Sequence, residues 1–134
     1  MGSKETDARI RIDKMLLESG WKLPGWYKDK EINVKTEIKN EHGEADYVLL
    51  NSKGFFLCTV EAKNSSKSPL VGKEKSREYA QSLRSRFIIL SNGIKHYLWD
   101  TKLGNPHLID RLPTQKYLEL RGESFNPPRE EDED

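Results

Sequence analysis

The stretch from residue 45 to residue 63 consists of two apolar segments on either side of a Ser-Lys-Gly turn. Short segments rich in Val, Leu and Phe that flank a glycine-containing turn predict a β-hairpin. Asp46 lies near the start of the first segment, and Glu61 and Lys63 lie near the end of the second. Because residues i and i+2 of a strand point to the same face, pairing of the two segments predicts that these charged side chains meet.

Two carboxylates beside an ammonium group suit the binding of a hard divalent cation and the polarisation of water next to a phosphate. The alternative is a cross-strand salt bridge on a solvated face of the sheet. The neighbouring residues favour a functional site, because apolar Val60 and Ala62 alternate with the charged side chains. An unpaired charge at the edge of an apolar core is unfavourable in free energy, so charged residues at this position indicate a functional role.

The rest of the chain predicts an α+β sandwich with a mixed sheet, in the order α-β-β-β-α-β-β. Thr6 or Asp7 can cap a first helix that ends at Gly20. The apolar run 87–90 follows a helix and predicts a buried strand that pairs parallel with an earlier one. The remaining elements are expected as strands at 32–38, 45–51, 55–63 and 94–99, a helix at 70–84, and a short helix near 114–118.

The length of 134 residues indicates a single domain. Charged and hydrophobic residues each make up 34% of the chain, which indicates a polar surface and a small core. The apolar runs are far shorter than the roughly 18 residues of a membrane span, and the polar first residues give no sign of a signal peptide. The single cysteine, Cys58, lies in an apolar strand and is expected to be a buried thiol. We therefore expect a reducing, cytoplasmic setting.

Charge is distributed unevenly along the chain. Residues 129–134 contain one arginine and five acidic residues, whereas the rest of the chain carries 22 basic and 17 acidic side chains. A mildly basic body permits a polyanionic partner but is equally compatible with an ordinary solvated surface. We assign residues 1–3 to an expression-vector remnant, 4–120 to the folded domain and 121–134 to a disordered acidic tail or linker.

Five short motifs, in this order, resemble the N-terminal nuclease domain of type I restriction enzyme R (motor) subunits and related restriction helicases. That domain belongs to the PD-(D/E)XK nuclease superfamily, and the resemblance covers residues 5–110. The motifs are Ala45-Asp46-Tyr47-Val48-Leu49-Leu50, Val60-Glu61-Ala62-Lys63, Gly72-Lys73-Glu74, Tyr79-Ala80-Gln81-Ser82-Leu83 and Leu90-Ser91-Asn92-Gly93.

The resemblance implies a metal-dependent endodeoxyribonuclease that hydrolyses DNA phosphodiester bonds with Mg²⁺, for which Mn²⁺ can substitute. It implies that Asp46, Glu61 and the Ala62 backbone carbonyl hold the metal, and that Lys63 orients the attacking water or stabilises charge on the phosphate. Many superfamily members add an acid from the first helix. Asp13 and Glu18 are both available for that role, and their spacing does not choose between them.

The resemblance also implies a DNA-facing helix after the catalytic strand, often marked by Gln-x-x-x-Tyr. Tyr79 matches the tyrosine, but Lys75 stands where the glutamine is usual and could contact phosphate as a point charge. The expected DNA contacts are Lys67, Lys73, Lys75, Arg77 and Tyr79. An ordinary solvated helix face, with Tyr79 as a core aromatic, is the alternative.

The family further implies a helicase motor domain and other restriction subunits as partners, and no Walker motif occurs in this sequence. Lys75 also motivates a second hypothesis, in which a nuclease-fold module has lost catalysis and binds DNA or a partner subunit. A third hypothesis is a structural or interaction domain without any role in nucleic-acid binding.

Overall fold

The computed structural model of this chain describes residues 4–125 and contains one mixed sheet with three α-helices. Along the chain the elements are α1 (Lys4–Glu18), the 3-10 helix η1 (Asp29–Glu31), β1 (Val34–Asn40), β2 (Gly43–Leu50), β3 (Phe56–Ala62), α2 (Lys73–Ser82), β4 (Phe87–Ser91), β5 (His96–Asp100), β6 (His107–Ile109) and α3 (Gln115–Phe125). Within the described residues, no helix is both long and apolar enough to cross a membrane.

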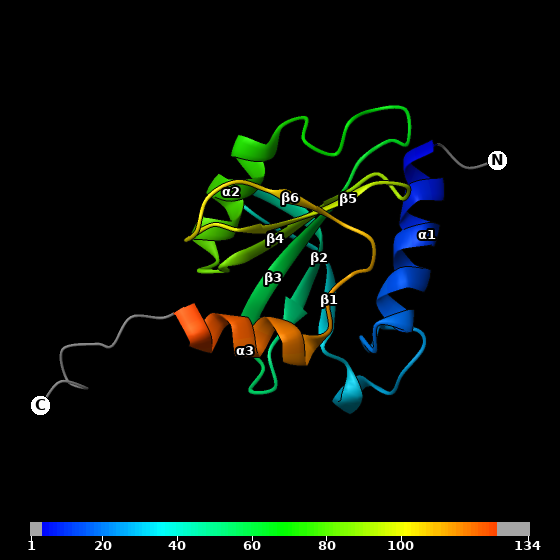
Figure 1. Cartoon of the computed structure of the whole chain (residues 1–134). Coiled ribbons are helices and arrows are strands. Elements are labelled where there is room, and N and C mark those ends of the chain that lie inside the picture. The colour runs from blue at the N-terminus through cyan, green and yellow to red at the C-terminus, as the bar shows by residue number, and fades with distance from the viewer. Residues whose placement is uncertain (1–3, 126–134) are drawn as a thin grey trace, which may run out of the picture.

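The six strands lie in sequence order across the sheet, and every neighbouring pair is antiparallel except β3 and β4. Helix α2 makes the crossover between the two parallel strands, as the apolar run 87–90 predicted. The expected α+β fold with a mixed sheet and the order α-β-β-β-α-β-β are therefore confirmed. Figure 1 shows the sheet between α1 on one side and α2 on the other.

Each face of the sheet is covered by its own helices. Tyr47 and Leu49 of β2 join the core beneath α1 and α3, whereas Val48 and Leu50 pack against the α2 side. Cys58 lies in the first of these clusters and is fully buried, as expected. Burial raises the pKa of this thiol, so it stays protonated and unreactive at neutral pH.

The first helix ends as predicted but begins earlier. Gly20 adopts a φ of 90°, and the Trp21 N–H donates to the Leu16 carbonyl at 3.0 Å, as in a Schellman motif. The N-cap prediction was wrong, because α1 already starts at Lys4. Thr6 and Asp7 consequently lie inside the first turns, where an acidic side chain still interacts favourably with the helix dipole.

Other element boundaries differ from the predictions for local reasons. Strand β6 was missed because a three-residue strand gives too little periodicity to detect. Helix α2 is shorter than the predicted 70–84, since Gly72 precedes it in a left-handed conformation. Helix α3 extends through a glycine to Phe125, beyond the predicted domain end at residue 120. The remnant at 1–3 and the tail segment 126–134 lie outside the described residues.

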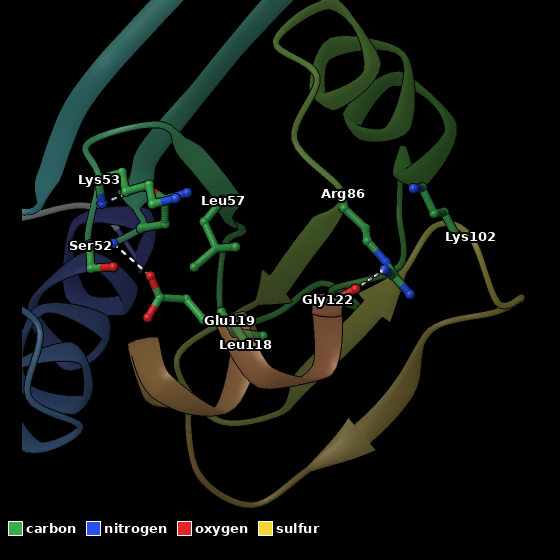
Figure 2. Close-up of a pocket in the computed structure, with 9 residues that line it drawn as sticks. Ser52, Lys53, Leu57, Arg86, Lys102, Leu118, Glu119 and Gly122 are labelled. Carbon is green, nitrogen blue, oxygen red and sulfur yellow. Dashed lines mark hydrogen bonds between the residues drawn. The ribbon is translucent and has the colours of Figure 1, made fainter. Parts of the chain in front are cut away.

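A buried ion pair attaches α3 to the sheet, and sequence reasoning did not anticipate it. Arg86, the residue before β4, donates from Nε and Nη2 to the two carboxylate oxygens of Asp100, at 2.8 and 2.9 Å. The third arm of the same guanidinium, Nη1, reaches the Gly122 carbonyl of α3 at 3.0 Å (Figure 2). Glu119 of α3 also accepts the Ser52 N–H at 2.6 Å, so the β2–β3 turn is held as well (Figure 2).

We expect Asp100→Asn to lower the free energy of unfolding by about 3 kcal/mol at neutral pH, because it leaves a buried arginine without its counter-charge. Burial alone would raise the pKa of Asp100, but the hydrogen bonds from Arg86 and the Lys102 N–H bring it below the ordinary 3.8. The stabilisation from Asp100 is therefore fully present above that ordinary value and is lost as the pH falls through the lowered pKa of the folded state.

Urea unfolding of the wild type and Asp100→Asn between about pH 7 and about pH 2 measures this difference. The gap between the two proteins should close toward the acidic end. A gap that stays constant over the whole range would contradict a stabilising role for the ionised carboxylate.

A second prediction concerns the end of α2, where Arg84 adopts a left-handed conformation with a φ of 58°. The Ser85 N–H donates to the Ala80 carbonyl at 2.9 Å, which places Arg84 at the position that normally favours glycine. Arg84→Gly should raise the free energy of unfolding by about 1 kcal/mol by removing this strain. Arg11→Gly, in the middle of α1, is the matched control and should lower it by about 1 kcal/mol. Equal destabilisation by both changes would refute the assignment.

Candidate functional site

The site lies where β2 and β3 part. Their regular pairing ends at Tyr47 and Val60, and Asp46 is the next residue of β2 in that register, opposite Glu61. Instead of a backbone carbonyl, the Asp46 carboxylate accepts the Ala62 N–H, with 2.7 Å between Oδ2 and the nitrogen. This hydrogen bond holds the Asp46 side chain next to Ala62, the residue that follows Glu61.

Glu61 and Lys63 complete the local cluster on β3 and the residue that follows it. Glu61 lies between Val60 and Ala62, both of which belong to the core beneath α1 and α3, so its side chain points to the α2 face. Lys63 Nζ lies 3.8 Å from Glu61 Oε1, and the two side chains are 25% and 21% exposed. Asp46 is similarly half-buried, at 18%. All three groups are therefore accessible to small ligands but not freely solvated.

Two hollows meet at Glu61. The first is lined by Arg9, Glu37, Lys39, Glu44, Ala45, Asp46 and Glu61. The second extends toward α2 and is lined by Glu41, His42, Gly43, Glu44, Glu61, Lys63, Gly72, Lys75, Ser76, Glu78 and Tyr79. Glu44 and Glu61 are common to both hollows, so the two form one continuous surface at this end of the sheet, in which acidic side chains outnumber lysine and arginine.

Arg9 of α1 is part of the site, and sequence reasoning missed it. Its Nη1 atom lies 3.1 Å from Glu37 Oε1 and 3.9 Å from Asp46 Oδ1. The guanidinium also lies 5.4 Å from the centre of the Tyr47 ring. The only sequence signal for this contact is that Arg9 shares the amphipathic helix with the predicted core residues, because the approach depends on how α1 docks onto the sheet.

The two first-helix acids are placed differently from each other. Asp13 accepts a hydrogen bond from the Tyr47 hydroxyl at 2.5 Å; desolvation and this bond raise the pKa of Tyr47. Glu18 lines another hollow with Met15, Ser19 and Asp110, and lies about 13 Å along the helix axis from Arg9. The structure thus does not bring Glu18 to the site, because the helical rise carries it away from the end of the sheet where Asp46 lies.

The predicted DNA contacts divide into two groups. Lys75 lines the hollow next to Lys63, and the exposed Lys67 lies in the loop that precedes α2. Lys73 and Arg77 instead lie over the Trp99 ring, at 4.9 and 5.6 Å from its centre. Both also pair with Glu74. Their charge is thus partly compensated within the protein, and only Lys75 lies directly beside the predicted catalytic cluster.

Tyr79 belongs mainly to the core, although it also contributes to the lining of the second hollow. Its side chain is buried, packs against Ala45 and Val48, and donates its hydroxyl to the Ile38 carbonyl at 2.8 Å. Gly43 approaches the ring so closely that a Cβ at that position would lie 3.4 Å from the Tyr79 Cβ. The tyrosine therefore anchors α2 against β1 and β2, and its contact with DNA stays a prediction.

The donor set is compatible with Mg²⁺, although the described residues contain no group of three or more acidic, histidine or cysteine side chains arranged for a metal. Mg²⁺ keeps several waters and is commonly held by one or two protein carboxylates, which Asp46 and Glu61 can provide. A site of this kind needs no third carboxylate from α1.

Comparison with known proteins yields a match in fold. No protein-family model matches the chain, and neither does any curated protein sequence. The chain is similar to a solved fragment of an HsdR subunit of a type I restriction enzyme from Vibrio vulnificus YJ016, with a TM-score of 0.74 and 24% sequence identity. The match covers 96% of this chain and 27% of the other, so this chain spans about a quarter of the length of that fragment.

The position of Tyr79 leads to a testable expectation. Tyr79→Phe should lower the free energy of unfolding by about 1 kcal/mol, because the buried Ile38 carbonyl loses its donor. DNA affinity, measured by fluorescence anisotropy, should not change. Tyr97→Phe is the matched control on the same face of the sheet and should affect neither quantity, because no hydrogen bond of its hydroxyl is found in the described structure. A weaker DNA complex with unaltered stability would restore Tyr79 to the DNA interface.

Proposed function

We propose that this chain is a metal-dependent endodeoxyribonuclease domain of a type I-like restriction or phage-defence system and acts in the cytoplasm. The observation that carries the proposal is the meeting of Asp46, Glu61 and Lys63 at the point where β2 and β3 separate. The similarity in fold to an HsdR fragment supports the same assignment.

Asp46 and Glu61 are the residues that would hold Mg²⁺ or Mn²⁺, with the Ala62 carbonyl as a further ligand. When bound, such an ion activates water and neutralises charge on the phosphate. The carboxylates suit this task because their side chains are half-buried, so the surrounding protein strengthens their attraction for a cation. The hydrogen bond from Ala62 orients the Asp46 carboxylate through its Oδ2 atom.

Lys63 supplies a positive charge on the α2 side of Glu61. At 3.8 Å from the carboxylate it is close enough to be attracted to it but too far for a hydrogen bond, so its ammonium can donate to water or to a phosphate oxygen. Lys75 lines the adjoining hollow and provides a second cation for the DNA backbone. The two lysines thus lead a phosphate toward the carboxylate pair.

We propose that partner domains or subunits determine where the DNA is cleaved. The chain matches about a quarter of the solved HsdR fragment to which its fold is similar. We therefore propose that a helicase motor domain and other restriction subunits bring DNA to this site. Phosphate contacts position DNA but do not read its sequence, which fits a domain whose specificity comes from elsewhere.

Plasmid nicking tests the catalytic assignment. Asp46→Ala, Glu61→Ala and Lys63→Ala should each reduce the rate with Mg²⁺ or Mn²⁺ to below about one hundredth of the wild-type rate, because each removes a group that acts on the reacting phosphate. Circular dichroism should show that the fold is retained.

Glu18→Ala is the matched control for this assay, since it removes an acid that lines a different hollow. Its nicking rate should equal that of the wild type. The proposal fails if the wild type and the three site variants nick DNA equally, or if only Glu18→Ala loses activity.

A second function is favoured by one observation, the position of Arg9 at 3.9 Å from Asp46. A permanent cation beside a predicted metal ligand fits a module that binds DNA or a partner subunit without catalysis. Calorimetric titration with Mn²⁺ separates the two functions. Metal uptake that disappears in Asp46→Ala and Glu61→Ala supports the nuclease, whereas DNA binding in EDTA by a protein that takes up no metal supports the binding module.

A further inference from the structure

We propose that Arg9 is a built-in competitor of the metal ion, so that its guanidinium lowers the affinity of the Asp46–Glu61 pair for a divalent cation. This inference rests on the nuclease function proposed above and assigns a regulatory role to a residue of α1. Arg9 acts through Asp46 and is therefore a positioning residue, not a catalytic one.

The position of the guanidinium is set by contacts on several sides. Its Nη1 atom donates to Glu37 Oε1 at 3.1 Å, and the planar group lies 5.4 Å from the centre of the Tyr47 ring. The Tyr47 hydroxyl donates to Asp13 Oδ1 at 2.5 Å, and Asp13 lies one helical turn beyond Arg9 on α1. Arg9 therefore stays close to the site even when Asp46 turns toward another partner.

Its contact with Asp46 is long enough to be exchanged. Asp46 Oδ2 is occupied by the Ala62 N–H at 2.7 Å, whereas Oδ1 lies 3.9 Å from Arg9 Nη1. That separation gives Coulomb attraction without a hydrogen bond, so the interaction is weaker than a metal–carboxylate bond would be. A metal ion that approaches this oxygen must replace a favourable interaction with Arg9.

Arg9 also opposes metal binding by electrostatic repulsion, which needs no direct contact with the ion. An arginine side chain remains charged at all physiological pH values, so it repels any divalent cation held by the same carboxylate. The site is only 18% exposed at Asp46, so bulk solvent screens this repulsion incompletely. Arg9 therefore weakens metal binding both by attracting Asp46 and by repelling the incoming ion.

Isothermal titration with Mn²⁺ on the full chain tests the inference. Arg9→Gln, which keeps the length and polarity of the side chain, should bind Mn²⁺ about tenfold more tightly than the wild type. Arg9→Lys keeps the positive charge near Asp46 and should therefore bind Mn²⁺ more weakly than Arg9→Gln. Arg11→Gln removes the same charge from an exposed position on α1 that does not line the site, and should also leave the affinity unchanged.

The outcomes separate this inference from the function on which it rests. Equal or weaker Mn²⁺ binding by Arg9→Gln, with uptake in the wild type that still depends on Asp46, overturns the inference alone. Tighter binding by Arg9→Lys and Arg11→Gln to the same degree as by Arg9→Gln also overturns it, because helix charge in general would then be the cause. Failure of every variant and of the wild type to take up Mn²⁺ overturns both the nuclease proposal and the role of Arg9.

Discussion

The hydrogen bond from the Ala62 N–H to the Asp46 carboxylate is the contact from which the rest of the site follows. Adjacent strands normally satisfy each other through their backbones, and here one side chain replaces the backbone acceptor where the two strands separate. The separation opens space beside Glu61, and the hydrogen bond keeps Asp46 at its edge. A carboxylate that is half-buried and hydrogen-bonded in this way is held in place before any ligand arrives.

Both layers of the fold contribute to this one end of the sheet. Helix α1 packs on one face and brings Arg9 to the Asp46 side, whereas α2 packs on the other face and brings Lys75 to the Glu61 side. The two helices are positioned by separate hydrophobic clusters, one centred on residues such as Leu16 and Val60 and the other on Val48 and Tyr79. The positive charges near the two carboxylates are therefore positioned by the packing of α1 and α2 on the two faces of the sheet.

The sequence was sufficient for those features that are specified by local patterns. The hairpin of β2 and β3 and the parallel pairing of β4 both have signals within a few residues, and the structure contains both of them. Features that depend on the docking of distant segments could not be read in this way. Arg9 reaches Asp46 and Arg86 pairs with Asp100 only after the helices and strands have packed.

Tyr79 shows that a motif does not predict the burial of its side chains. Its match to a DNA-facing pattern correctly located a helix beside the predicted site, but the pattern carried no information about which side of the helix is buried. Contact with Gly43 and the hydrogen bond to the Ile38 carbonyl place its ring in the core. Lys75, one turn earlier, lines the hollow beside Lys63 with an exposed side chain, whereas the buried Tyr79 contributes only to the edge of that hollow. A motif can thus predict where along a helix a residue lies. It does not predict whether the side chain points to the core or to the surface.

A crystal of the chain soaked in Mn²⁺ and examined by anomalous diffraction tests whether Asp46 and Glu61 hold a metal ion together. We expect one strong anomalous peak within bonding distance of both the Asp46 and Glu61 carboxylates. A peak at another location, or none at a Mn²⁺ concentration that saturates binding in solution, would contradict the claim that this pair of carboxylates forms the metal site.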